Sequence, residues 1–352
     1  MKFLNSNYIR FVQIVAVFLL LHSFPVFAAD TATADEQCMI DLLQSGEDGM
    51  TLGEIRTQCT GATAEVVAAE QVVEQDSDSE DEPGKVEARL HADRDAAAKP
   101  FSLLAHKPNY LLAAAYNFEG WAPEWYQLTD TDPEYTNKDY EAQFQISLKV
   151  PLALDLFNGH MDIYGAYTNR SFWQVYNSDY SEPFRETNHE PELWAQFTND
   201  WEIWGFKNAL NAVGWVHQSN GAAGLQSRSW NRMYANFVFE KDNFALSFKP
   251  WIWLSKDKST SDNPDITDYM GHGEFRFAWQ RNDHVVTMML RNQLESGFDK
   301  GAVEIGWSIP VFDYPYLKAY VQYFNGYGES LIDYNRKVNR IGVGISLTDW
   351  ID

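Results

Sequence analysis

Apolar and polar residues alternate along most of the chain after its first hundred residues. Residues 142–150 show the pattern clearly, because every even-numbered residue is apolar and every odd-numbered residue is polar. Similar alternation recurs in residues 244–255, 303–309 and 317–323. Since successive side chains of a β-strand point to opposite faces, this period of two predicts strands with one apolar face and one polar face.

Two all-β architectures share this pattern. A soluble β-sandwich buries the apolar faces, whereas a transmembrane β-barrel turns them toward lipid and keeps the polar faces inside. Most alternating segments are nine to twelve residues long, close to the ~9–11 residues that cross a bilayer at a tilt. About twelve such segments fit between Asn109 and Trp350. We therefore predict an all-β protein that forms a twelve-stranded antiparallel transmembrane β-barrel over residues 105–352.

The N-terminal part of the chain differs from this pattern. Residues 1–28 combine basic residues, a short apolar core at 11–21 and a small-residue end, which is typical of a cleaved secretory signal peptide. Residues 29–104 are rich in Ala, Asp and Glu and contain the acidic run 76–82. They hold few large apolar residues, so we expect an acidic, partly disordered periplasmic extension. A solvated linker is its simpler interpretation, and a cation- or partner-binding tail is the alternative.

Charge and composition narrow the function classes. The formal net charge of −23 and a pI near 4.6 argue against nucleic acid as a partner. The chain has 13 Trp, 18 Tyr and 22 Phe although its mean hydropathy is −0.40, which is typical of an outer-membrane barrel but also compatible with a secreted sandwich enzyme. For Cys38 and Cys59 we expect a local disulfide rather than a metal site, because an exported protein meets an oxidising compartment.

His217, Ser219 and Asn231 are the strongest candidates for chemistry. His217 and Ser219 are two residues apart, so both leave the same face of a strand, and Asn231 falls on the matching face of the next strand. A base, a hydroxyl and an amide that can orient the base are the components of a serine hydrolase. The alternative is that they are strand-end residues entering a polar loop. All three fall on an apolar, lipid-side face, where polar groups cost free energy, so we expect a lipid ester as substrate.

Further motifs surround the trio. The sequence reads His-Gln-Ser-Asn-Gly at 217–221 and Ser-Arg-Ser-Trp-Asn-Arg at 227–232. Other segments accompany them: Pro-Phe-Arg-Glu-Thr-Asn at 183–188, Glu-Pro at 190–191, Lys-Pro-Trp at 249–251, Asp-Asn-Pro-Asp-Ile at 262–266, and Gly-Tyr-Gly-Glu-Ser-Leu-Ile-Asp-Tyr-Asn at 326–335. In this order, and over a region from about residue 105 to the C-terminus, they closely resemble the outer membrane phospholipase A family.

The resemblance implies a twelve-stranded outer-membrane barrel with an ester-hydrolysing site on its outer surface. Ser219 would be the nucleophile and His217 the general base that takes its proton. Asn231 would hold the imidazole where better-known triads use Asp. The backbone N–H of Gly221, helped by a calcium-bound water, would stabilise the oxyanion.

The resemblance also implies calcium at the active site of a homodimer. The ligand positions correspond to the Ser227 hydroxyl, the Ala222 carbonyl and Ser181 of the second subunit, with Asp262 as a further calcium-binding position. Position 222 is Ala where the family has Arg, but a carbonyl ligand does not depend on the side chain. Asn169 aligns with a membrane-buried Gln at the dimer interface of the family.

The resemblance thus predicts a calcium-dependent phospholipase A that is activated by dimerisation. Its A1, A2 and lysophospholipase activities would hydrolyse acyl esters of glycerophospholipids and lysophospholipids in the outer membrane. Two rival interpretations remain. In a passive, porin-like barrel the trio would be inert, although about twelve strands disfavour a wide pore. A soluble secreted lipase would usually carry a Gly-x-Ser-x-Gly elbow, which is absent around Ser219.

Overall fold

The computed structural model describes residues 83–121, 135–199, 201–254, 261–292, 299–312 and 314–351. All of these residues belong to one compact unit. The signal peptide, the Cys38–Cys59 pair and the acidic run expected from the sequence lie outside the described residues. Within the described ranges, no helix combines the length and the apolar character needed to cross a membrane.

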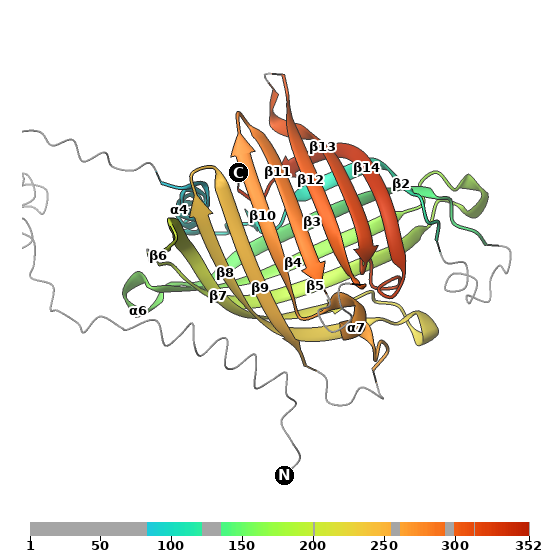
Figure 1. Cartoon of the computed structure of the whole chain (residues 1–352), viewed down its shortest axis with the longest axis horizontal. Helices are drawn as coiled ribbons and strands as arrows, with labels where there is room; N and C mark the ends of the chain where they lie inside the picture. Colours follow the sequence, from blue (N-terminus) through green and yellow to red (C-terminus); the bar gives the residue numbers. More distant parts are fainter. Residues whose placement is uncertain are drawn as a thin grey trace, which may run out of the picture. The chain divides into compact units, whose positions relative to one another are not determined.

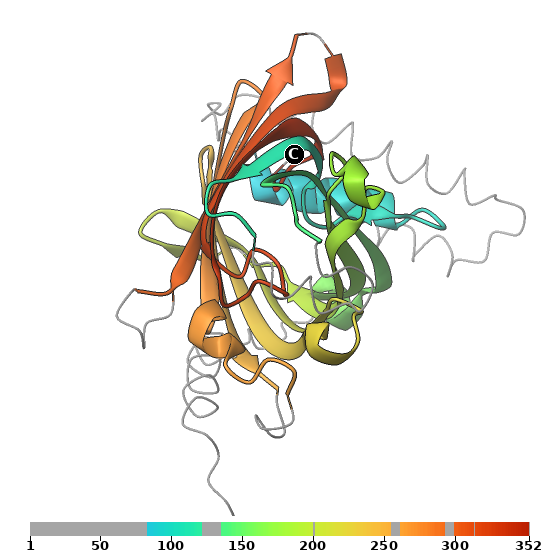
Figure 2. The same cartoon turned by 90° about the vertical axis from the view of Figure 1, so that its right-hand side faces the viewer.

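Twelve long antiparallel strands form a closed barrel in the described residues, as the sequence predicts (Figures 1 and 2). Each strand pairs with the next along the chain, and the last pairs with the first, which closes the sheet. The strands are β2 (Asn109–Asn117), β3 (Tyr140–Asp155), β4 (Met161–Trp173), β5 (Phe184–Phe197), β7 (Phe206–Ser219), β8 (Ser229–Lys241), β9 (Phe244–Trp253), β10 (Gly273–Arg281), β11 (His284–Asn292), β12 (Gly301–Val311), β13 (Tyr314–Tyr327) and β14 (Lys337–Thr348).

Short elements connect or flank these strands. Two further strands of two residues each pair with β3 and with β7. Short helical turns occur in the connecting segments, and one longer helix precedes the barrel. The elements are α4 (Lys85–Ala97), β1 (Leu104–Ala105), α6 (Leu156–Gly159), η1 (Ser178–Tyr180), β6 (Glu202–Ile203), η2 (Gly224–Gln226) and α7 (Ile266–Met270).

The barrel wall has its polar face inside and its apolar face outside. On β3, Gln143 and Ser147 are fully buried, whereas Ile146 is 51% and Val150 37% exposed. A soluble sandwich would show the reverse, because its apolar residues form the core. The structure therefore excludes the soluble-sandwich interpretation, and the apolar outer face is the one that meets lipid.

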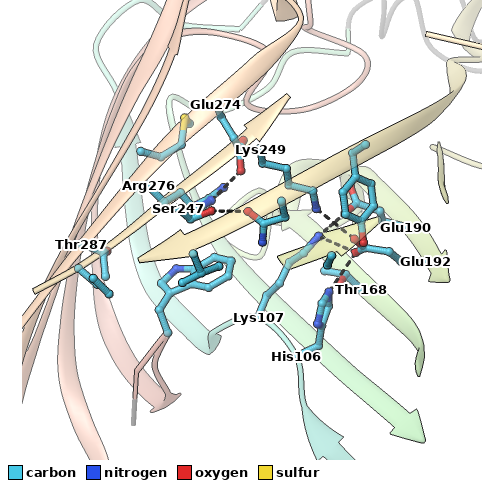
Figure 3. Close-up of a pocket in the computed structure, with 18 of the residues that line it drawn as sticks. His106, Lys107, Thr168, Glu190, Glu192, Ser247, Lys249, Glu274, Arg276 and Thr287 are labelled. Carbon is cyan, nitrogen blue, oxygen red and sulfur yellow. Dashed lines mark hydrogen bonds and ion pairs between the residues drawn. The ribbon is translucent and has the colours of Figure 1, made fainter. Parts of the chain in front are cut away.

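Charged side chains fill the barrel interior around a cavity of about 310 Å³ (Figure 3). The Glu192 carboxylate accepts hydrogen bonds from Lys249 Nζ at 3.0 Å and contacts His106 Nε2 at 3.0 Å. Arg170 on β4 lies 3.4 Å from Glu304 on β12, so this ion pair crosses the barrel. Such ion pairs provide partners for charged groups that the barrel wall shields from bulk water. The paired side chains also leave the lumen narrow.

The two ends of the barrel differ in the length of their connections. At one end, two-residue turns join β8 to β9 and β10 to β11; Asn282 and Asp283 both have φ values in the left-handed region, as tight hairpin turns require. At the other end the connecting segments are longer, among them 174–183, 220–228 and 328–336. Outer-membrane barrels carry short turns on the periplasmic side and long loops outside. The end of β7 at Ser219 therefore lies on the long-loop side.

Helix α4 packs at the short-turn end, where it contacts β1 and β9 (Figure 1). The backbone N–H groups of Val86 and Glu87 donate to the Glu240 carboxylate at 2.8 and 3.2 Å, which caps the otherwise unpaired first turn. Near the other end of the helix, the Arg94 guanidinium donates to both carboxylate oxygens of Asp162 at 3.1 Å. The described part of the expected extension thus includes a helix attached to the barrel.

Candidate active site

His217 and Asn231 face each other across two neighbouring strands. They are direct partners in the antiparallel pairing of β7 with β8, and His217 Nδ1 lies 3.0 Å from Asn231 Oδ1. Because an amide oxygen only accepts, His217 Nδ1 carries the proton of this hydrogen bond. In the neutral ring the other nitrogen, Nε2, is then free to accept a proton, which is the state that a general base needs.

Ser219 is the last residue of β7 and shares its outer face with His217. The segment that follows is organised by Asn220, which is only 8% exposed. Its Oδ1 accepts from the backbone N–H of Arg228 at 2.9 Å, and its Nδ2 donates to the carbonyl of Gln226 at 2.8 Å. Sequence reasoning missed Asn220, although an Asn at the start of a polar turn commonly bonds nearby backbone in this way.

Gly221 has a left-handed backbone conformation with φ = +67°. A Cβ at this position would lie 3.7 Å from the His189 imidazole, which is an ordinary van der Waals distance. Glycine is therefore favoured by the left-handed backbone conformation and not by a lack of space. This backbone geometry fixes the direction of the N–H group just beyond Ser219.

The candidate trio lies on the outer wall of the barrel, away from the interior cavity. On the same face, Trp215 and Met233 are 40% and 39% exposed. Gln218, between His217 and Ser219, and Arg232, next to Asn231, face the opposite way and line the interior cavity (the cavity shown in Figure 3). The trio would therefore meet a substrate that approaches from the membrane and not one that enters the lumen.

A packed inner layer supports the hairpin that carries the trio. Trp230 Nε1 donates to Gln218 Oε1 at 2.8 Å, and the Arg232 guanidinium stacks 4.1 Å from the centre of the Trp230 ring. Arg232 also lies 3.4 Å from Glu190 on the adjoining strand β5. These contacts restrain β7 and β8 from inside, which keeps the outward-facing groups in a fixed relation.

The residues proposed as calcium ligands are partly brought together. Ser227 Oγ donates to Asp262 Oδ2 at 2.6 Å, and Ala222 belongs to the same 220–228 segment as Ser227. Ser181 lies in a different connection, directly after η1, with φ = +59°. Hydroxyl, carbonyl and carboxylate oxygens are hard ligands of the kind that Ca²⁺ takes. No group of three or more His, Cys, Asp or Glu side chains that would hold a metal occurs among the described residues.

His189 is a second histidine beside the trio that sequence reasoning passed over. It is the direct strand partner of Ser219 in the pairing of β5 with β7. Its Nδ1 lies 2.6 Å from the hydroxyl of Tyr167 on β4. No short-range signal marks His189, because it is thirty positions before Ser219 and meets it only through barrel pairing.

The fold and the site together define a class: a membrane β-barrel that carries the groups of a serine hydrolase on its lipid-facing wall. The family comparison is more specific. The model of the phospholipase A1 family matches residues 86–347, which include nearly all of α4 and of the barrel. The chain therefore belongs to the phospholipase A1 family, and this confirms the resemblance seen in the motifs.

Individual relatives agree with this assignment. Phospholipase A1 of Escherichia coli K12 is 35% identical over 288 residues, which cover 81% of this chain and 93% of the relative. A crystal structure of the Salmonella typhi outer membrane phospholipase dimer with bound calcium has a TM-score of 0.66 at 34% identity and covers 72% of this chain and 96% of that one. An active-site mutant of E. coli outer membrane phospholipase A has a TM-score of 0.67 at 33% identity and covers 76% and 98%. The chain is thus an ester-hydrolysing enzyme built as an outer-membrane β-barrel.

Proposed function

We propose that this chain is a calcium-dependent phospholipase A that cleaves acyl esters of glycerophospholipids and lysophospholipids, at both the A1 and A2 positions, by a Ser-His-Asn mechanism. The observation that carries the proposal is the 3.0 Å contact between His217 and Asn231 on the lipid-facing wall, with Ser219 on the same face of the strand. The location on the long-loop side suits an ester bond at the head-group boundary.

The proposed reaction proceeds in two halves. Ser219 Oγ attacks the ester carbonyl carbon while His217 Nε2 takes the hydroxyl proton, and the same proton then passes to the leaving alcohol as the ester C–O bond breaks. Water hydrolyses the acyl-serine by the reverse proton route, which releases the fatty acid. Asn231 keeps Nε2 directed at Ser219 but brings no negative charge to the imidazolium. The backbone N–H of Gly221 donates to the oxyanion.

Calcium fits the oxygen groups around this site. Ser227, Asp262 and the Ala222 carbonyl would hold it, with Ser181 contributed by a second copy of the chain. When bound, the ion supplies positive charge that stabilises the developing oxyanion. Two of these side chains already lie 2.6 Å apart, and a structurally similar relative from Salmonella typhi was solved as a dimer with bound calcium.

Dimerisation is part of the proposal because one copy supplies an incomplete ligand set. Asn169 lies on the outer wall as the strand partner of His189, and a hydrogen bond from its side chain to a second barrel would support the dimer within the membrane. A monomer would then be inactive, which restrains a lipase that is surrounded by its own substrate.

The test is release of fatty acid from phospholipid in detergent micelles by the folded, purified protein, with calcium or with a chelator. Wild type should release fatty acid only with calcium, and Ser219→Ala should abolish the release. Ser229→Ala is the matched control, since it removes a hydroxyl from the strand partner of Ser219 and should retain activity. Absence of calcium-dependent release, or release unaffected by Ser219→Ala, would show that the proposal is wrong and favour a passive barrel.

A further inference from the structure

Two imidazoles flank Ser219, and the proposed mechanism uses only one of them. His217 is two residues before Ser219 on β7, and His189 lies directly opposite Ser219 on β5. Directly paired residues of an antiparallel sheet share one face, with Cβ atoms about 4.5–5.5 Å apart. His189 is therefore as close to the nucleophile as the proposed base is, from the other side.

The hydrogen-bond partners of the two histidines favour opposite tautomers. His217 Nδ1 faces the acceptor oxygen of Asn231, so its proton is on Nδ1 and its Nε2 is an acceptor. His189 Nδ1 instead faces the Tyr167 hydroxyl at 2.6 Å. A phenol is a stronger acid than a neutral imidazole N–H, so the hydroxyl donates and Nδ1 accepts. The proton of the neutral His189 ring is then on Nε2, which makes this nitrogen a donor.

The donor edge of His189 faces Gly221. The position that a Cβ would occupy on Gly221 is 3.7 Å from both Nε2 and Cδ2 of His189. Because residue 221 is glycine, no Cβ lies between its backbone and this imidazole edge. In the proposed mechanism the ester carbonyl oxygen approaches the backbone N–H of Gly221, so it would also come close to this imidazole edge.

We propose that His189 is a second oxyanion donor: its Nε2–H hydrogen-bonds the ester carbonyl oxygen as that oxygen gains negative charge, and Tyr167 is a positioning residue that sets the tautomer. The inference rests on the proposed role of Ser219 as nucleophile. His189 transfers no proton in any step; it donates one hydrogen bond that strengthens while the Ser219 Oγ–carbon bond forms. His217 remains the base, since only its Nε2 can accept.

The chain offers matched variants for a test. His189→Leu removes the donor, His189→Gln places an amide N–H donor near the former Nε2, and Tyr167→Phe removes the hydroxyl that sets the tautomer. His284→Leu is the control, because His284 is also on the barrel but is the first residue of β11, at the short-turn end opposite the site. Each variant is compared with wild type for kcat and KM on a phospholipid ester in micelles with saturating calcium, after its folded barrel is verified by heat-dependent migration in electrophoresis.

His189→Leu should lower kcat about 100-fold with little change in KM, as expected for loss of one oxyanion donor. His189→Gln should recover at least about a tenth of wild-type kcat, and Tyr167→Phe should fall between the two. Sulfur accepts hydrogen bonds weakly, so wild type should strongly prefer an oxoester over the matching thionoester. This preference should shrink in His189→Leu and persist in His189→Gln.

The outcomes separate this inference from the proposed function. If wild type releases no fatty acid, or Ser219→Ala remains active, the proposed function fails and the His189 inference with it. If wild type is active and Ser219→Ala is not, wild-type kcat in His189→Leu would overturn the donor role alone. An equal fall in the Leu and Gln variants with an unchanged oxoester preference would also overturn it, because it would show a purely structural effect.

Discussion

Replacing Asn231 with Ala removes the oxygen that accepts the His217 hydrogen bond and is proposed to orient this ring, and the size of the effect follows from the hydrogen bond that is lost. The contact is 3.0 Å long, and the proposed general base acts from its neutral form. A neutral hydrogen bond contributes about 0.5–1.5 kcal/mol, and one to a charged group about 1.5–3 kcal/mol. Only the gain that appears when His217 becomes an imidazolium lowers the barrier. That difference is about 1–1.5 kcal/mol, so kcat should fall roughly tenfold.

The assay is the rate of fatty acid release at saturating phospholipid and calcium. Asn231→Asp, which keeps an acceptor oxygen in place, should retain wild-type kcat or exceed it. Asn236→Ala is the control, because Asn236 is on the same strand but contacts Ser247 on β9 and lines the interior cavity. An unchanged kcat in a folded Asn231→Ala protein would refute the orienting role. A loss as complete as that of Ser219→Ala would refute the expected tenfold magnitude.

Three further predictions address other parts of the molecule. Gly221→Ala should cost about 1–3 kcal/mol of backbone strain, because φ is +67° there. It should lower kcat in the micelle assay without changing the calcium requirement. Asp262→Ala should raise the calcium concentration for half-maximal activity, measured by titration from chelator, because it removes the carboxylate beside Ser227; an unchanged midpoint would remove Asp262 from the ligand set. Arg94→Ala should lower the free energy of barrel unfolding in urea by about 1 kcal/mol, because it leaves the buried Asp162 without this partner; an unchanged midpoint would show that α4 contributes nothing through this pair.

The barrel was largely predictable from sequence because its signal is local. Period-two alternation marks the lipid-facing residue at position 146 and the interior residues at 143 and 147, and their burial confirms this. The opposition of His217 and Asn231 was also accessible, since a hairpin with a short polar loop places the two strands in contact. Local alternation alone did not say which face was inside; strand length and family resemblance did.

What the sequence did not reveal depends on pairings between distant segments. His189 meets Ser219 only because β5 and β7 pair in one register, which nothing in either strand specifies by itself. The ion pair of Arg170 with Glu304 crosses the barrel and joins residues more than a hundred positions apart. Helix α4 was missed as an attached element because charged residues occur around most of its circumference, so its few apolar contacts, such as those of Val86 and Ala97, form no clear amphipathic stripe.

The attachment of α4 also sets an order of assembly. The helix precedes every strand of the barrel in the chain, yet its partners come from both early and late strands. Arg94 binds Asp162 on β4, Glu240 at the end of β8 caps the first turn, and Arg89 donates to the carbonyl of Asp349 after β14. Since these groups converge only when the barrel has closed, α4 cannot complete its contacts until the last strand is in place. The first described element to be synthesised is thus among the last to complete its contacts. Docking of α4 would therefore mark the closure of the barrel.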